Sequence, residues 1–218
     1  MNKLVIFDLD GTLIDSLGDI ADSMNEVLAT LGYPTHPEDA YRTKVGDGVG
    51  NLVLRSLPPG TVTPQRVEDC KIRMREAYAK RLTRRTRPYP GIVNMLVGVR
   101  ERGARVAVFS NKPDPATREI CAVLFNGHPF AFVLGATATI PLKPDPAGVH
   151  HILKATTTEP AETLYVGDTN TDMKTGRAAG VRTIGVTWGF RAEAELTASG
   201  ADAIIHRPDD LLNDAFFA

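Results

Sequence analysis

Short apolar segments recur along the chain, and each one ends abruptly in a cluster of polar residues. The clearest cover residues 4–7, 105–109, 163–166 and 182–186, and a weaker one covers residues 130–134. Apolar runs of this length without polar alternation are typical of strands that are covered on both faces. The sequence therefore predicts a parallel sheet that is buried between two layers of helices.

Helical patterns separate these segments. They cover residues 91–102, 115–125, 146–155 and 170–179, with apolar side chains spaced three and four apart where the pattern is strongest. Strands and helices that alternate with short connections predict an α/β fold with a doubly wound, Rossmann-like parallel sheet. In such sheets ligands bind at the carboxyl ends of the strands, which is where the polar clusters fall.

One long stretch, residues 15–87, interrupts this alternation with helical patterns alone. Its first apolar stripe begins after Asp15 or Ser16, either of which is a suitable N-cap, and ends at Gly32. A helical block after the first strand of a parallel sheet predicts an inserted cap domain. We expect residues 1–14 and 88–218 to form the catalytic core and residues 15–87 to form the helical cap.

Composition and charge narrow the environment and the partners. The chain has 25 basic and 26 acidic side chains, so no net field favours nucleic acid or an acidic membrane. Cys70 and Cys121 are far apart in the sequence, and we expect two reduced thiols. No segment has the length of a signal peptide core or a membrane span. These features favour a cytoplasmic protein that acts on small molecules.

Carboxylates follow two of the predicted strands. Asp8 and Asp10 come directly after residues 4–7, and Asp168 and Asp172 follow residues 163–166. Hard divalent cations such as Mg²⁺ prefer carboxylate and carbonyl oxygens. Asp8, Asp168 and a backbone carbonyl suit such an ion, and Asp172, one helical turn on, suits the ordering of its waters.

Neutral and basic donors occur at two other places that we assign to the same edge. Ser110, Asn111 and Lys112 follow one predicted strand, and Lys143 precedes a predicted helix beside Pro144. A hydroxyl, an amide and an ammonium group together are suited to hold a phosphoryl group and to neutralise its oxygens. The combination predicts a site for a phosphorylated small molecule.

Four motifs in this order resemble those of the phosphatases of the haloacid dehalogenase superfamily. They are Asp8-Leu9-Asp10-Gly11-Thr12-Leu13, Ser110-Asn111-Lys112, Lys143-Pro144-Asp145-Pro146, and Gly167-Asp168-Thr169-Asn170-Thr171-Asp172. The match in order and spacing extends over nearly the whole chain. The presence of Asp10 sets the chain apart from the dehalogenase branch, which lacks this acid and uses no metal.

The resemblance implies a role for each motif residue. Asp8 would attack phosphorus and become an aspartyl-phosphate, while Asp10 would protonate the leaving group and later activate water. Ser110 and Lys143 would be catalytic, and Asn111 would bind the substrate. The third-motif lysine of the superfamily corresponds to Lys143 and not to Lys112. The metal would be Mg²⁺, with the following ligand residues: Asp8, Asp10 through its carbonyl, Asp168 and Asp172.

Within the superfamily the chain is most similar to bacterial phosphoglycolate phosphatases. The similar stretches are residues 15–16, 44–48, 88–91 and 186–190. This likeness implies 2-phosphoglycolate as the substrate, read by a cap loop over residues 42–48. We expect Arg42, Lys44 and the backbone amides near Gly46 to bind the substrate carboxylate. Asp47 stands where a neutral residue is expected, and its charge would act against such a substrate.

Other functions on the same fold stay open. One is a phosphosugar mutase, which would need a cap residue that keeps water away, and another is a phosphatase of a different small metabolite, such as a phosphosugar or pyrophosphate. A non-enzymatic binding protein is a third alternative, but it has no reason to keep all five of the predicted catalytic and metal-binding carboxylates and lysine. We expect a monomer or a homodimer that binds a small phosphorylated metabolite, with no nucleic-acid or membrane partner.

Overall fold

The computed structural model describes residues 2–217 and contains one six-stranded sheet. The strand order is β5-β4-β1-β6-β7-β8, and every neighbouring pair is parallel. The strands are β1 (Leu4–Phe7), β4 (Arg105–Pro113), β5 (Phe132–Ala136), β6 (Thr163–Gly167), β7 (Arg182–Val186) and β8 (Ala203–Ile205). The predicted doubly wound α/β fold is confirmed.

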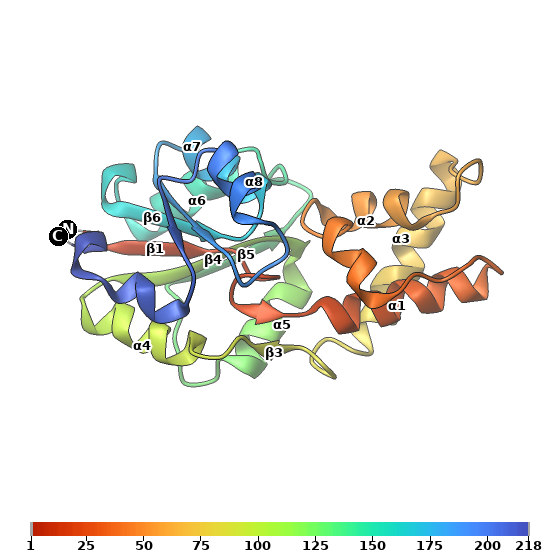
Figure 1. Ribbon diagram of the computed structural model, residues 1–218, viewed down its shortest axis with the longest axis horizontal. Helices are drawn as coiled ribbons and strands as arrows, with labels where there is room; N and C mark the ends of the chain where they lie inside the picture. The colour runs from red at the N-terminus through yellow and green to blue at the C-terminus, as the bar shows by residue number, and fades with distance from the viewer. Residues whose placement is uncertain (1, 218) are drawn as a thin grey trace.

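Helices cover both faces of the sheet (Figure 1). One face carries α4 (Ile92–Glu101) and α5 (Asp114–Leu124), and the other carries α6 (Ala147–Thr156), α7 (Asn170–Ala178) and α8 (Glu193–Ala198). Successive side chains of β1 point to opposite faces of the sheet, so that Val5 and Phe7 belong to one core cluster and Leu4 and Ile6 to another. Each face therefore needs its own layer of helices. Short 3₁₀ turns complete the core: η2 (Pro160–Glu162), η3 (Pro208–Leu212) and η4 (Asp214–Phe216).

A helical unit lies beyond the sheet, on the right of Figure 1. It contains α1 (Leu17–Thr30), η1 (Glu38–Thr43), α2 (Gly48–Ser56) and α3 (Pro64–Ala79). The chain enters and leaves this unit through an antiparallel pair, β2 (Ile14–Asp15) and β3 (Arg87–Pro88), in which Ile14 pairs with Pro88. The two connections therefore run side by side, and we propose the division into a core and a cap over residues 15–87 on this basis.

The structure differs from the sequence prediction at several element ends. β8 was not predicted because it has only three residues, and β2 and β3 have two each. β5 begins two residues later than expected and β4 extends to Pro113. Ser16 occupies the N-cap position of α1 but makes no capping bond with its side chain. Within residues 2–217, no helix combines the length and the apolar character that crossing a membrane requires.

Candidate active site

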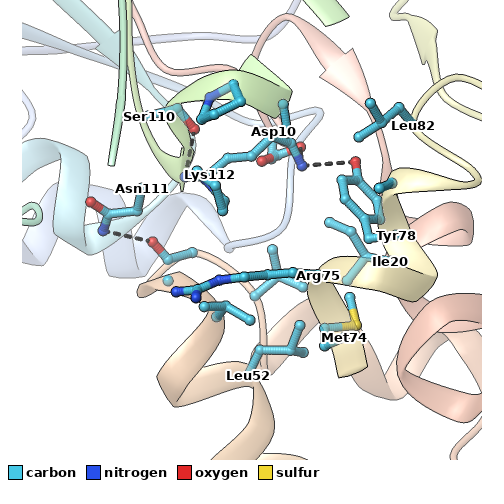
Figure 2. Close-up of a pocket in the computed structure, with 18 of the residues that line it drawn as sticks. Asp10, Ile20, Leu52, Met74, Arg75, Tyr78, Leu82, Ser110, Asn111 and Lys112 are labelled. Atoms are coloured by element: carbon cyan, nitrogen blue, oxygen red, sulfur yellow. Dashed lines mark hydrogen bonds and ion pairs between the residues drawn. The ribbon is translucent and has the colours of Figure 1, made fainter. Parts of the chain in front are cut away.

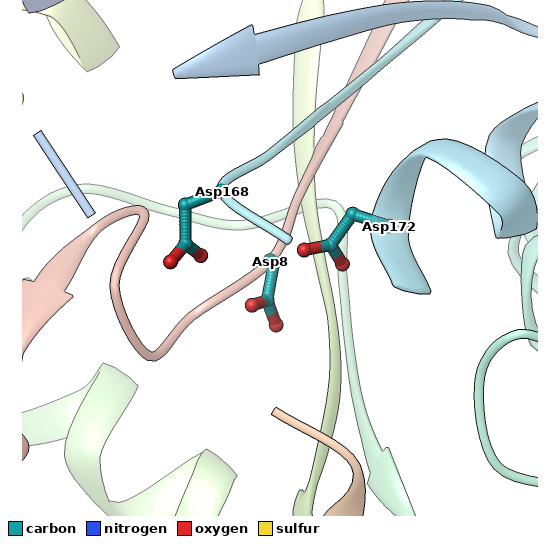
Figure 3. Close-up of side chains that lie close together, drawn as sticks. All are labelled: Asp8, Asp168 and Asp172. Carbon is teal, nitrogen blue, oxygen red and sulfur yellow. The ribbon is translucent and has the colours of Figure 1, made fainter. Parts of the chain in front are cut away.

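Three carboxylates meet where β1 and β6 end (Figure 3). Asp8 follows β1, Asp168 follows β6, and Asp172 lies in the first turn of α7. Because β1 and β6 are adjacent parallel strands, their carboxyl ends lie side by side. One oxygen from each side chain lies within 4.8 Å of the others, and all three residues are buried.

The first turn of α7 fixes Asp172. The hydroxyl and the backbone N–H of Thr169 donate to Asp172 Oδ2 at 2.7 and 3.0 Å, and Thr169 caps the helix in return. The other oxygen, Oδ1, therefore faces the site, where it accepts from Lys143 Nζ at 2.7 Å.

Two donors and two glycines define the surroundings of Asp168. Thr12 Oγ1 donates to Oδ1 at 2.9 Å, and the backbone N–H of Phe190 donates to Oδ2 at 2.7 Å. Gly11 has a φ of 89°, and a Cβ there would lie 2.3 Å from Asp168 Oδ2. A Cβ on Gly189 would lie 2.3 Å from Asp168 Cβ. Both positions need glycine so that the backbone can approach this carboxylate closely.

Lys143 joins two of the carboxylates. Its Nζ lies 2.7 Å from Asp8 Oδ1 and 2.7 Å from Asp172 Oδ1, and its side chain is buried. Burial alone would lower the pKa of Lys143, but the carboxylates of Asp172 and Asp8 outweigh it and raise the pKa well above its usual value. Lys143 is therefore a fixed positive charge at the centre of the site.

The charges in this cluster do not balance. Three buried carboxylates, those of Asp8, Asp168 and Asp172, face the single ammonium group of Lys143. Burial raises the pKa of Asp8 well above its usual value in spite of Lys143, and burial followed by the charge of Asp172 raises the pKa of Asp168 to about 7. An excess of buried negative charge on hard oxygen atoms suits a divalent cation, so these residues fit a metal site.

Asp10 turns away from the carboxylate cluster. Its Oδ1 accepts from Ser16 Oγ at 2.5 Å and lies 2.9 Å from Lys112 Nζ. Lys112 Nζ also donates to Tyr78 Oη of α3 at 2.8 Å and lies 4.3 Å from the centre of that ring (Figure 2). Asp10 is thereby tied to the helical unit through one lysine, and among the described residues its carboxylate does not belong to the candidate metal cluster.

Ser110 and Asn111 lie at the end of β4, beside the carboxylates. Asn111 Oδ1 accepts from the backbone N–H of Lys143 at 2.8 Å, and Nδ2 donates to the carbonyls of Lys143 and Gly46 at 3.2 and 3.1 Å. Asn111 thus holds the Lys143 loop and the cap loop together. Ser110 Oγ accepts from the Lys112 N–H at 3.2 Å, and no acceptor within residues 2–217 engages its own proton, which can reach a ligand.

A cavity of about 320 Å³ separates these residues from the helical unit (Figure 2). Polar side chains of the core line one side of it: Asp8, Asp10, Ser110, Asn111 and Lys112. The opposite wall is mostly apolar and comes from α1, α2, α3, the loop before α2 and the turn after α3: Ile20, Val45, Val49, Leu52, Met74 and Leu82. A bound molecule would therefore have its polar end on the sheet and its body against the cap.

The structure places only part of the predicted cap loop at this cavity. Gly46 lines it, whereas Arg42 and Lys44 do not. Arg42 donates to the carbonyl of Gly189 at 3.1 Å, and Lys44 Nζ donates to the carbonyl of Arg55 at 2.6 Å. Both cations instead serve contacts within the cap and between cap and core.

Asp47 is also directed away from the cavity. Its carboxylate accepts from Thr171 Oγ1 at 2.6 Å and pairs with Arg55 at 2.5 Å. Burial acts to raise the pKa of Asp47, but Thr171 and Arg55 outweigh it and hold the pKa below its usual value. The charge of Asp47 is compensated, and its bond to Thr171 is a contact between cap and core.

Two residues of α3 at the cavity were not singled out from the sequence. Arg75 lines the cavity, and Tyr78 both lines it and contacts Lys112. They are three positions apart, so they share a face of the helix. The spacing of the two residues could have indicated that they face one cavity. The many basic residues of the segment instead favoured the interpretation of a helix exposed to solvent.

The fold and the site together define an enzyme that works at the carboxyl edge of a Rossmann-like sheet. The model of the haloacid dehalogenase-like hydrolase family matches residues 5–186, and the chain belongs to this family. The predicted superfamily and the predicted enzyme class, a phosphoric monoester hydrolase, are confirmed.

Individual relatives extend over most of the chain. The phosphoglycolate phosphatase of Haemophilus influenzae is 34% identical over 206 residues, which cover 92% of each chain. That of Pseudomonas putida is 33% identical and covers 96% of this chain and 77% of its own. The crystal structure of a predicted phosphoglycolate phosphatase from Haemophilus somnus superposes with a TM-score of 0.90 at 28% identity, covering 98% of both chains.

Proposed function

We propose that this protein is a magnesium-dependent phosphatase that hydrolyses a small phosphate monoester, 2-phosphoglycolate, through an aspartyl-phosphate on Asp8. The observation that carries the proposal is the position of Asp8. It lines the cavity, it lies within 4.8 Å of an oxygen of each of two other buried carboxylates, and it lies 2.7 Å from the ammonium group of Lys143. A carboxylate in this setting faces both a cation site and a fixed positive charge, as attack on a phosphate dianion requires.

The proposed reaction has two steps. In the first, an oxygen of Asp8 bonds to phosphorus as the ester P–O bond breaks, and Asp10 gives a proton to the leaving alkoxide. In the second, Asp10 takes a proton from water as the water oxygen bonds to phosphorus, which releases inorganic phosphate and regenerates Asp8. Bonds from Ser16 and Lys112 occupy Asp10 Oδ1. This leaves Oδ2 for proton transfer.

Charge compensation falls to the remaining groups. Magnesium, when bound by Asp8, Asp168 and the Asp10 carbonyl, would neutralise phosphoryl oxygens, with Asp172 orienting the waters of the ion. Lys143 and the Ser110 hydroxyl would hold the transferring group. Because both donors of Asn111 are engaged by backbone carbonyls, we assign Asn111 the positioning of Lys143 rather than a phosphoryl contact.

The proposed substrate rests on the relatives named phosphoglycolate phosphatase, which match the chain over most of its length. The test is a screen of small phosphate monoesters, including 2-phosphoglycolate and phosphosugars, together with the anhydride pyrophosphate, with magnesium and with excess chelator. We expect 2-phosphoglycolate to have the highest kcat/KM and chelation to stop turnover reversibly. Undiminished hydrolysis in chelator would contradict the metal-dependent mechanism, and preference for another ester would contradict the substrate.

A further inference from the structure

One positively charged side chain that lines the cavity, that of Arg75, forms no ion pair with the core within residues 2–217. The charged residues that line the cavity are Asp8, Asp10, Arg75, Lys112 and Glu119. Lys112 is engaged by Asp10 and Tyr78. Within residues 2–217, Arg75 forms neither an ion pair nor a side-chain hydrogen bond, so its guanidinium is available to a ligand.

Arg75 approaches the cavity from the cap. Its side chain extends from α3 past Leu52 and Met74 toward the side on which Asn111 lies (Figure 2). Arg75 and Lys112 are the cations that line the cavity, and among the described residues Arg75 is the one of the two that no hydrogen bond or ion pair engages. A guanidinium beside apolar surface binds a carboxylate well, since two parallel N–H donors match its two oxygens.

We propose that Arg75 is the residue that determines substrate specificity, by binding a carboxylate at the end of the leaving group opposite the phosphoryl group. The inference deepens the proposed phosphatase function and rests on it. It moves the recognition of the second anionic group from Arg42 and Lys44, which do not line the cavity, to α3.

Two acidic side chains compete with a ligand for Arg75: Glu68 of α3, whose pKa is lowered by Lys71 and also by Arg75, and Glu119. Glu119 lies on α5 at the same cavity and is exposed, but it forms no ion pair with Arg75 within residues 2–217. Its effect on a bound carboxylate therefore acts through solvent, which screens charge strongly. Glu119 therefore weakens the attraction between Arg75 and an anionic leaving group, but it does not take the place of the leaving group as the partner of Arg75.

The size of the cavity widens the class of substrate. Its volume of about 320 Å³ lies within the range of roughly 300–1,000 Å³ typical of pockets for whole organic ligands. Leaving groups longer than the two carbons of glycolate therefore fit between the phosphoryl site and Arg75. The expected substrates are phosphate monoesters of short hydroxycarboxylic acids. The length of the carbon chain decides how well the carboxylate of the substrate can contact the guanidinium group of Arg75.

A matched series of esters tests this inference. The carboxylated members are 2-phosphoglycolate, 3-phosphooxypropanoate and 4-phosphooxybutanoate, and the neutral members are ethyl, propyl and butyl phosphate. At each length, the ratio of the two kcat/KM values isolates the contribution of the carboxylate. The variants are Arg75→Met, the control Arg73→Met on the same helix but outside the cavity, and Glu119→Gln.

We expect the wild-type ratio to be roughly ten- to a hundredfold at the best chain length, which is the effect of one charge-assisted interaction. Arg75→Met should bring the ratio to within about threefold of one, Arg73→Met should leave it unchanged, and Glu119→Gln should raise it. Arg75 is exposed, so the variant is expected to fold.

An Arg75→Met ratio equal to that of the wild type would overturn the inference. The same drop in Arg73→Met would also overturn it, because a general field of the basic helix would then explain the preference. A different result would contradict the proposed phosphatase function itself. In that case the wild-type protein would hydrolyse none of the six esters, including the neutral ones.

Discussion

Lys143 Nζ lies 2.7 Å from Asp8 Oδ1, and both side chains are buried. The same nitrogen lies 2.7 Å from Asp172 Oδ1, so one ammonium group separates two carboxylates that would otherwise repel each other. The proposed nucleophile and the lysine that neutralises its target are thus one structural unit. The loop that carries Lys143 is held in turn by Asn111.

Replacement of this lysine should affect stability and activity together. Lys143→Met leaves Asp8 and Asp172 without their shared counterion, which is expected to cost about 3–5 kcal/mol in the free energy of unfolding when no metal is bound. We expect turnover to fall by at least about a hundredfold, because the transferring group loses its fixed positive charge. Urea unfolding in chelator and steady-state kinetics measure the two effects. Lys154→Met, an exposed lysine on α6, is the control, and equal behaviour of the two variants would contradict this role.

Asn111 offers a more selective change. Asn111→Asp keeps the acceptor for the Lys143 N–H but loses the two donors to the carbonyls of Lys143 and Gly46. A carboxylate facing two carbonyl oxygens is unfavourable, and we expect a loss of about 1–3 kcal/mol in the free energy of unfolding. We also expect a fall in kcat for every ester tested, because Lys143 is displaced. A change confined to KM for one ester would instead show that Asn111 contacts the substrate.

The cap loop should respond differently from the expectation based on its sequence. Asp47 is paired with Arg55 and bonded to Thr171, outside the cavity. Asp47→Asn is therefore expected to change the preference between carboxylated and neutral esters by less than about threefold. Thr171→Val removes the hydroxyl that donates to Asp47, whereas Asp47→Asn keeps an acceptor oxygen for it, so we expect the larger fall in kcat in Thr171→Val. A marked gain for the carboxylated esters in Asp47→Asn alone would contradict this interpretation.

Metal binding should depend on pH through Asp168. In the metal-free protein, burial and then Asp172 raise the pKa of Asp168 to about 7 from 3.8. Between these values the folded state holds a proton on Asp168 that the unfolded chain has lost, so this group's contribution to stability falls as the pH rises and is gone above about pH 7. Magnesium must displace that proton. Its stabilising effect should therefore grow with pH up to about 7 and then level off.

Thermal unfolding with chelator and with excess magnesium, at about pH 5.5 and about pH 8, measures this linkage. We expect the magnesium-induced rise in Tm to be larger at the higher pH, and to be small at both pH values in Asp168→Asn. A rise of the same size at both pH values in the wild type would contradict competition between the proton and the metal.

The sequence predicted the parts of the site that lie at strand ends. Asp8 and Asp168 follow uninterrupted apolar runs, and a parallel sheet necessarily brings the carboxyl ends of adjacent strands together. Local pattern and topology were sufficient there. Lys143 was predicted to join the site, but its contact with Asp172 depends on which oxygen Thr169 leaves free.

The sequence did not predict which cap residues face the cavity. Arg42 and Lys44 stand beside a glycine-rich turn, whereas Arg75 lies in a helix whose many basic residues are alike in sequence. Only the orientation of α3, which packs against α1 and α2, distinguishes Arg75, which lines the cavity, from Arg73, which does not. The engagement of Lys112 by Tyr78 has the same origin, because the two residues come from different units.

Phosphorylation of Asp8 is tested most directly by trapping the aspartyl-phosphate intermediate. In Asp10→Asn the first step can proceed with an aryl phosphate, whose leaving group needs little acid, while hydrolysis of the intermediate lacks its base. The measurement is mass spectrometry of the acid-quenched variant after incubation with an aryl phosphate and magnesium. We expect one added phosphoryl group on the peptide that contains Asp8 in Asp10→Asn, and no added phosphoryl group on that peptide in the double variant Asp8→Asn/Asp10→Asn. An adduct that persists in the double variant, or no adduct in Asp10→Asn while aryl phosphate is still hydrolysed, would contradict phosphorylation of Asp8.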